Sequence, residues 1–184
     1  MIGQLPCLLK INGKNYPINS DFRVVLNLFA AFNDDKLTEL EKAFVCVNCL
    51  FLDEITDDIF TEAVQKAYWF IDGGDMPKSE PSKIKLLDWE HDQSIIFPAI
   101  NKAAGTEVRT IQYMHWWTFL GYFGEIGEGL FSTVINIRYK RANSKKLDKW
   151  EHEFLLKHKE MIIFYTDEER QAIEETEEFL KTII

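Results

Sequence analysis

The sequence lacks a continuous apolar segment long enough to cross a bilayer. Its longest uncharged run, residues 110–124, contains His115 and is shorter than the roughly 20 residues that a membrane-spanning helix needs. The amino terminus has neither the basic start nor the continuous apolar region of a secretory signal. We therefore expect no membrane partner and a protein that works in the cytoplasm of the cell that makes it.

Cysteine is scarce, with three residues in a chain of 184. An odd number of thiols is typical of a reducing compartment rather than of a disulfide framework. Cys46 and Cys49 form a C-x-x-C pair inside a helical pattern, whereas redox pairs lie where a strand meets a helix. Zinc normally has four ligands, and Cys7 is the one further cysteine. We interpret the pair as small buried core residues and predict no metal site.

Positive charge is also scarce, because 21 Lys and Arg stand against 30 Asp and Glu, a formal net charge of −9. Proteins bind nucleic acid largely by neutralising phosphates, so this balance argues against general affinity for DNA or RNA. A nucleic-acid role would need a local basic patch.

Residues 138–149 form such a patch, with Asp148 as the one acid. Its basic residues are Arg138, Lys140, Arg141, Lys145, Lys146 and Lys149. Residues 167–181 have the opposite composition, with seven acids against Arg170 and Lys181. Two interpretations are open. The segments are solvated helix faces that pair within one chain, or they attract another chain through opposite charge, which would produce self-association.

The residues that are abundant indicate a packed helical protein. An apolar fraction of 46% with 28% charged residues is typical of a globular chain that buries a core. Asn12-Gly13 lies between the short runs 7–11 and 15–18, which is typical of a β-hairpin. Most other apolar residues recur with the helical period. We predict a mainly α fold of about seven or eight amphipathic helices with a short N-terminal β-hairpin.

Capping residues place the first three helices. We expect one from Ser20 or Asp21 to residues 33–35, one after a Thr38–Glu41 capping box, and one from Thr56 to Gly73. The apolar residues at helical spacing should form one buried stripe on each helix. The stripe of the first helix is Phe22, Val25, Leu26, Phe29 and Phe32, that of the second is Leu40, Phe44, Val47, Leu50 and Phe51, and that of the third is Phe60, Ala63, Val64, Ala67 and Ile71.

Residues 73–82 combine two glycines and two prolines with charged residues, which is typical of a linker. We therefore divide the chain into an N-terminal hairpin and three-helix region 1–73, a linker 74–87 and a C-terminal helical region 88–184, with one packed unit as the alternative. In the last region we expect a helix from Asp88 to about residue 103 that kinks or restarts at Pro98.

Further helices are expected from about Thr110, over 130–141 and over 144–164, and a last one after a Thr166–Glu169 capping box. The helix over 144–164 should bury Leu147, Trp150, Phe154 and Met161.

Six of the seventeen residues in 113–129 are aromatic, so this stretch is either a core helix or a docking surface. Core is the favoured alternative, because so many exposed rings would promote aggregation. Gly121, Gly124, Gly127 and Gly129 lack the preceding strand and the Gly-Lys-Ser/Thr of a phosphate loop. They should instead permit close backbone approach or a turn.

The histidines do not form a ligand pattern. His152 and His158 are six residues apart on one predicted helix and face different directions. His91 could join Asp88 or Asp92, and His115 could join Glu125 or Glu128, but no spacing requires either pair. We find no nucleophile in a known turn and no paired carboxylates, so we predict no catalytic, metal-binding or cofactor-binding residue and no enzyme activity.

Several segments together resemble a known family. They are DWE at 88–90, N-K-x-A-G at 101–105, HWWTFLGYF at 115–123, F-S-T-V-x-x-I-R at 131–138 and K-K-L-x-K-W-E at 145–151, with the hairpin and the F-x-x-V-L-x-L-F helix in the amino half. In these features the chain resembles the tail-assembly chaperones of phages and prophages of Gram-positive bacteria.

The resemblance implies a protein of the host bacterial cytoplasm, present during phage assembly, that binds the helical, apolar tape-measure protein and keeps it soluble. It implies further contacts with the tail-tube protein and a second assembly chaperone. The alternatives are a structural tail component retained in the virion and a helical nucleic-acid-associated protein.

Aromatic side chains are enriched at anchors of protein interfaces, and basic side chains steer association. We therefore expect the partner-binding residues to be among Trp89, His115, Trp116, Trp117, Phe119, Tyr122, Phe123, Arg138, Lys140, Arg141, Lys145 and Lys146.

Overall fold

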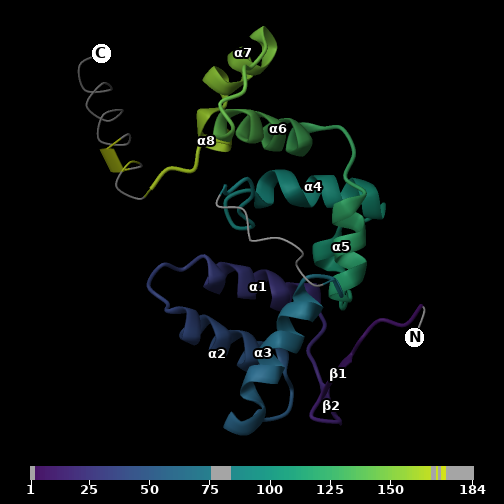
Figure 1. The fold of residues 1–184 in the computed structure, drawn as a ribbon. Coiled ribbons are helices and arrows are strands. Elements are labelled where there is room, and N and C mark those ends of the chain that lie inside the picture. The colour runs from purple at the N-terminus through teal and green to yellow at the C-terminus, as the bar shows by residue number, and fades with distance from the viewer. Residues whose placement is uncertain (1–2, 76–83, 167–168, 170, 173–184) are drawn as a thin grey trace. The chain divides into compact units, whose positions relative to one another are not determined.

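A computed structural model of the chain describes residues 3–75, 84–166, 169, 171 and 172. The chain divides into two compact units, Met1–Gly127 and Glu128–Ile184, which we describe separately (Figure 1). The described residues contain a two-stranded hairpin, eight α-helices and one 3-10 turn. The prediction of a mainly α fold with an N-terminal hairpin is confirmed.

The first unit begins with the expected hairpin. Strands β1 (Leu8–Ile11) and β2 (Lys14–Pro17) pair antiparallel, and Leu9 lies opposite Tyr16. Asn12 and Gly13 both have positive φ, at 46° and 79°, which is the backbone of the tight turn that the Asn-Gly pair favours. The inward-facing residues of the hairpin are buried against the helices.

Three helices follow, and side-chain caps are present at the first two. Helix α1 (Phe22–Phe32) begins after Asp21, whose carboxylate accepts the amide of Arg23, and α2 (Glu39–Leu50) begins with the Thr38–Glu41 capping box. Helix α3 (Asp57–Ile71) follows Thr56. Helix α1 packs on α2, α2 on α3, and α3 on β1.

The next three elements complete the first unit. They are α4 (Gln93–Ala104), the 3-10 turn η1 (Val108–Thr110) and α5 (Trp116–Gly124). The predicted start of α4 at Asp88 is wrong, because the Asp88 carboxylate accepts the amides of Glu90 and His91 in a separate turn. A single helix continues through Pro98 without a restart.

Helices α4 and α5 pack on each other, and α5 also packs on α1. Elements on both sides of the expected linker therefore belong to one compact unit, and the division of the structure lies at Gly127. The linker expected over 74–87 lies largely outside the described residues.

The second unit contains α6 (Leu130–Ala142), α7 (Lys149–Lys157) and α8 (Lys159–Ile162). The prediction of one continuous helix over 144–164 is wrong. Asp148 and Glu151 form a capping box that starts α7 at Lys149, and His158 interrupts the chain between α7 and α8 with φ −127° and ψ 42°. The predicted Thr166–Glu169 capping box is present, while most of the helix predicted after it lies outside the described residues.

The core of the first unit contains large side chains from every helix, among them Phe22, Leu50, Phe70, Ile96 and Trp116. In the third helix Ile59 and Phe70 are buried, whereas Phe60 and Val64 of the predicted stripe are half-buried. In the described part of the chain, no helix has both the length and the apolar character needed to span a membrane.

We predict that Trp116→Ala lowers the free energy of unfolding by about 3–5 kcal/mol, as expected for deleting a large buried ring. Its side chain is 1% exposed and makes a buried hydrogen bond. Denaturant unfolding followed by circular dichroism measures the change. Leu40→Ala, at a helical position of the same unit that is 62% exposed, is the control and should shift the value by no more than about 0.5 kcal/mol. Equal effects of the two substitutions would contradict a core role for Trp116.

Candidate partner-binding surfaces

His115 caps α5 and is structural. Its Nδ1 accepts the amide of Trp117 at 3.0 Å, so this nitrogen carries no proton. Its Nε2 lies 3.1 Å from the carbonyl oxygen of Pro6, which can only accept, so Nε2 donates. Both ring nitrogens are thus occupied by contacts within the first unit.

The two tryptophans that follow His115 fasten α5 to the end of α3. Trp116 Nε1 donates to the carbonyl of Ile71, and Trp117 Nε1 donates to the carbonyl of Phe70, each at 2.8 Å. These carbonyls lie in the last turn of α3, where carbonyls lack the amide partners of the helix interior, and the Phe70 carbonyl also accepts the Gly73 amide at 3.2 Å. The paired indoles therefore satisfy a helix end and join two elements that are distant in sequence.

The aromatic stretch contributes two of its rings, Trp116 and Phe119, to the core, while Tyr113 is exposed. Phe119 is fully buried, and its ring stacks on Phe22 at 4.5 Å and on Trp116 at 5.7 Å. Trp116, Phe119 and His115 are therefore not on the surface. Of the predicted partner-binding residues in this unit, Trp89, Trp117, Tyr122 and Phe123 are half-buried.

Trp89 borders a hollow in the surface of the first unit. Its ring packs against Phe29 at 6.0 Å and Phe123 at 5.1 Å. The hollow has a volume of about 350 Å³ and is lined by residues of α1, α4 and the turn before α4, namely Leu26, Asn27, Ala30, Asn33, Asp88, Trp89, Glu90, Gln93 and Phe97.

Arg138 of the basic segment is structural, since it is 4% exposed within the second unit. Its guanidinium donates to the carbonyls of Ile162 and Met161 at 3.1 and 2.6 Å and lies over the ring of Phe164, 4.0 Å from the centroid. These contacts hold α8 and the chain after it against α6. The sequence could not distinguish this arginine from its exposed neighbours.

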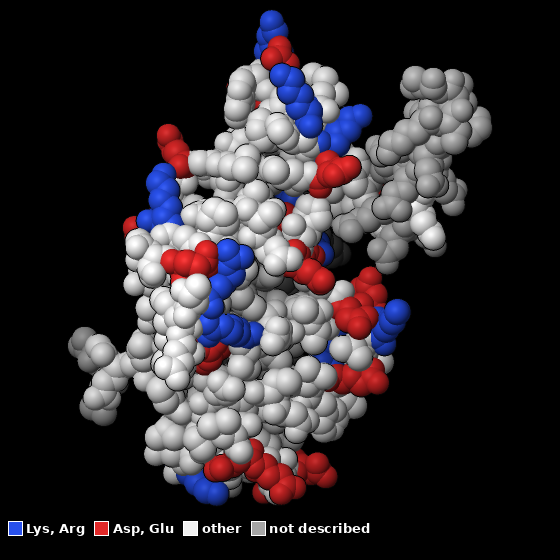
Figure 2. Space-filling model, turned by 180° about the vertical axis from the view of Figure 1, so that it is seen from behind, with Lys and Arg blue, Asp and Glu red and all other residues white. Residues whose placement is uncertain are grey.

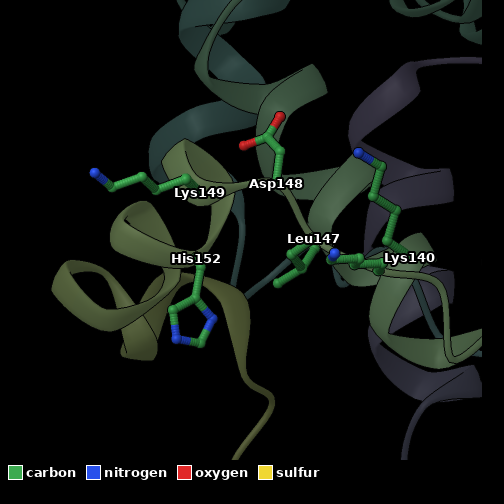
Figure 3. A pocket seen from close by; sticks show the side chains of 6 residues that line it. Lys140, Leu147, Asp148, Lys149 and His152 are labelled. Carbon is green, nitrogen blue, oxygen red and sulfur yellow. The ribbon is translucent and has the colours of Figure 1, made fainter.

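The remaining predicted basic residues lie at the surface around the α6–α7 connection. Arg141, Lys145 and Lys146 are exposed, and Figure 2 shows basic side chains projecting from this part of the second unit. Lys140 is half-buried and paired with Glu151. A shallow hollow of about 610 Å³ is lined by Lys140, Lys146, Leu147, Asp148, Lys149 and His152. Figure 3 shows that these side chains come from α6, the connection and α7.

Helix α7 buries a carboxylate and exposes a tryptophan, while Phe154 and Leu155 are half-buried. Among its nine residues, all described, the buried one is Glu151, whose carboxylate accepts from Lys140 and from Asn136. Trp150, by contrast, is 57% exposed. The rings of Trp150, Phe154 and His158 follow each other at 5.4 and 4.5 Å, and we call these three residues the aromatic stripe. The prediction that Trp150 is buried is wrong, because the carboxylate network occupies the inner face.

A second exposed apolar surface lies on α2 and α3. Leu40 and Phe44 are 62% and 43% exposed, although the helical period predicted both as buried. The Phe44 ring lies 4.5 Å from that of Phe60. Nearby, exposed acids follow the turn from α2 into α3, namely Asp53, Glu54, Asp57 and Asp58.

No other described part of the chain approaches the glycines of the aromatic stretch closely. Among the described residues, nothing lies within 4 Å of the position that a Cβ would take at Gly121, Gly124, Gly127 or Gly129. The close approach is at Gly74, where a Cβ would lie 2.7 Å from the Trp117 ring and where φ is +93°. This glycine follows α3 and leaves room for the indole.

The large pKa shifts among the ionisable groups have structural causes, namely burial and ion pairing. Burial raises the pKa of the Cys46 thiol to about 12, and Arg109 holds the pKa of the Glu107 carboxyl at about 2. Cys46 is buried as predicted, whereas Cys49 is exposed and not the core residue we expected. His91 contacts Asp92 at 2.7 Å, one of its two expected partners. In the described ranges, no three His, Cys, Asp or Glu side chains are grouped as metal ligands would be.

Comparison with protein families gives a match over residues 1–163 to the family described as bacteriophage Gp15 protein. The chain belongs to the bacteriophage Gp15 family. The match includes the hairpin and all eight described α-helices, because α8 ends at Ile162. Comparisons with curated proteins and with solved structures gave no match.

Within this Gp15 chain, the acidic residues from Asp167 onward lie beyond the matched region, whereas the basic hollow and the aromatic stripe lie inside it. Sequence reasoning selected the basic residues but missed the stripe. The signal was the four-residue spacing of Trp150, Phe154 and His158, which by itself does not tell an exposed face from a buried one.

We predict that iodoacetamide modifies Cys7 and Cys49 of the native protein and leaves Cys46 unmodified between pH 7 and pH 9. Cys46 is fully buried and its pKa is raised to about 12, so the thiol stays protonated over this range, and the thiolate is the reactive form. Peptide mass spectrometry identifies the modified sites, and the unfolded chain is the control in which all three react. Modification of native Cys46 at the rate of Cys49 would contradict the assignment.

Proposed function

We propose that this Gp15 family protein is a phage tail-assembly chaperone. In this proposal it acts without catalysis in the host cytoplasm, binds the tape-measure protein, keeps it soluble and promotes assembly of the tail tube around it. Membership of a bacteriophage family supports the phage role, and the resemblance of five sequence segments to tail-assembly chaperones supports the finer one.

The observation that carries the proposal is the exposure of Trp150 on α7. Exposing Trp150 to water while burying a carboxylate is unfavourable for an isolated domain, since a large ring gains free energy when it leaves water. Such a face is expected where a partner covers it. The aromatic stripe therefore supports a binding function for the second unit.

A helical apolar client matches this surface in kind. An amphipathic helix places anchors at i, i+3, i+4 and i+7, which can pack along a row of rings with four-residue spacing. The basic side chains of Lys146 and Lys149, which line the hollow, would favour client segments that carry acidic residues.

We predict that co-expression with the phage's tape-measure protein increases the soluble fraction of that protein. Trp150→Ala with Phe154→Ala should remove most of this gain, because the two rings provide the apolar contact. The measurement is the amount of tape-measure protein in the supernatant after centrifugation.

Leu40→Ala with Phe44→Ala is the matched control, since it removes two exposed apolar side chains from the first unit. It should preserve the solubility gain. Loss of the gain in this variant alone would place the client on the α2–α3 surface, and no gain with the unchanged protein would contradict the chaperone proposal.

A chaperone leaves before the particle is complete, so we predict that purified virions contain this chain far below the amount of the tail-tube protein. Quantitative mass spectrometry of particles measures the ratio. A fixed stoichiometric amount would instead identify a structural tail component.

A further inference from the structure

We propose that the hollow beside Trp89 in the first unit binds an arginine side chain that a protein partner presents. In this site the guanidinium lies against the aromatic wall and donates hydrogen bonds to the Glu90 carboxylate and to side-chain amides on the rim. The site belongs to the first unit, whereas the exposed Trp150 of the proposed client surface belongs to the second, so the inference does not depend on that client.

The size of the hollow fits one side chain. Its volume of about 350 Å³ lies at the lower end of the roughly 300–1,000 Å³ that is typical of small-ligand pockets. On α1 the lining residues extend only from Leu26 to Asn33, which is about two helical turns. A hollow of this size holds a long side chain and the peptide groups beside it, but not a client helix along its length.

The D-W-E segment at 88–90 lines the hollow with all three of its residues. Asp88 is already satisfied, because its carboxylate accepts two backbone amides and pairs with Lys85 at 2.6 Å. Glu90 is exposed, and its carboxylate makes no hydrogen bond or ion pair within the part of the chain that the structure describes. The negative charge that the hollow offers to a ligand is therefore that of Glu90.

The wall of the hollow is aromatic and carries no positive charge. Trp89 and Phe97 line it with Leu26 and Ala30, and none of the described lining residues is Lys, Arg or His. Cations bind to the faces of aromatic rings, and arginine does so more often than lysine because its guanidinium is planar. Phe97 already makes this contact within the chain, since the Arg109 guanidinium lies 4.9 Å from its ring centroid. The wall therefore favours a cation from a partner.

Three side-chain amides on the rim match the donors of a guanidinium. Asn27, Asn33 and Gln93 are exposed and line the hollow, and within the described residues their side chains make no hydrogen bond. Arginine has five N–H donors in a planar fork, whereas lysine has three on a single nitrogen. The amide oxygens and the Glu90 carboxylate can accept several of these donors at once, which selects arginine over lysine.

The test uses the full-length protein and the peptide N-acetyl-Leu-Arg-Leu-amide. A second peptide with citrulline in place of arginine is the matched control, because citrulline keeps the shape of arginine without its charge. The affinity is measured from the tryptophan indole signals in proton–nitrogen NMR spectra, and the Trp89 signal is assigned by its loss in Trp89→Phe. The arginine peptide should shift this signal and bind at least about fivefold more tightly than the citrulline peptide.

Two substitutions test the charge and the shape of the hollow separately. Glu90→Gln should weaken binding of the arginine peptide about two- to fivefold, the range of an exposed ion pair, and Glu54→Gln, at an exposed acid outside the hollow, should not. Ala30→Phe fills the hollow and should abolish binding, whereas Gln65→Phe, at an exposed helical position outside it, should preserve binding. Circular dichroism of each variant confirms that it is folded.

Equal affinity for the arginine and citrulline peptides would overturn the inference, and so would unaltered binding in Glu90→Gln or in folded Ala30→Phe. The absence of any shift of the Trp89 signal at millimolar peptide would also overturn it. Tighter binding of a peptide with leucine in place of arginine would overturn it and identify the hollow as a pocket for an apolar anchor. None of these results bears on the tape-measure assay, so the inference and the proposed function fail separately.

Discussion

The fastening of α5 to the end of α3 is the contact on which the first unit depends. Two neighbouring indoles donate to two successive carbonyls, of Ile71 and Phe70, in the last turn of α3. The backbone adds a second tie, because the Trp116 amide donates to the Ser20 carbonyl and the Phe22 amide to the Met114 carbonyl. These bonds explain why residues on both sides of the glycine- and proline-containing segment form one compact unit.

The second unit is organised around buried charge instead of buried rings. Glu151 and Arg138 are both about 4% exposed, and each has several hydrogen-bond partners inside the unit. Removing a hydrogen-bond partner of a buried charge costs more free energy than removing the partner of a surface charge, because the remaining charge is left unpaired in a medium of low dielectric. The Glu151 carboxylate lies on the inner face of α7, whereas Trp150 is exposed and Phe154 is half-buried.

The sequence by itself determined the elements whose signals are local. Asn12-Gly13 specified the turn of the hairpin, and Asp21 and the Thr38–Glu41 box specified the starts of α1 and α2, because each signal acts within a few residues. The aromatic density of residues 113–129 indicated a core helix, and Trp116 and Phe119 are buried.

Only the tertiary structure decided which face of each helix is buried and which charges are structural. Leu40, Phe44 and Trp150 match the helical period as well as buried residues do, yet 62%, 43% and 57% of their surface stays exposed in the packing of the described elements. Arg138 and Lys146 belong to one basic run. Arg138 alone is structural, because its guanidinium donates to the carbonyls of Met161 and Ile162, which lie 23 and 24 residues further along the chain. Burial depends on contacts between distant segments, and the period of one helix carries no information about them.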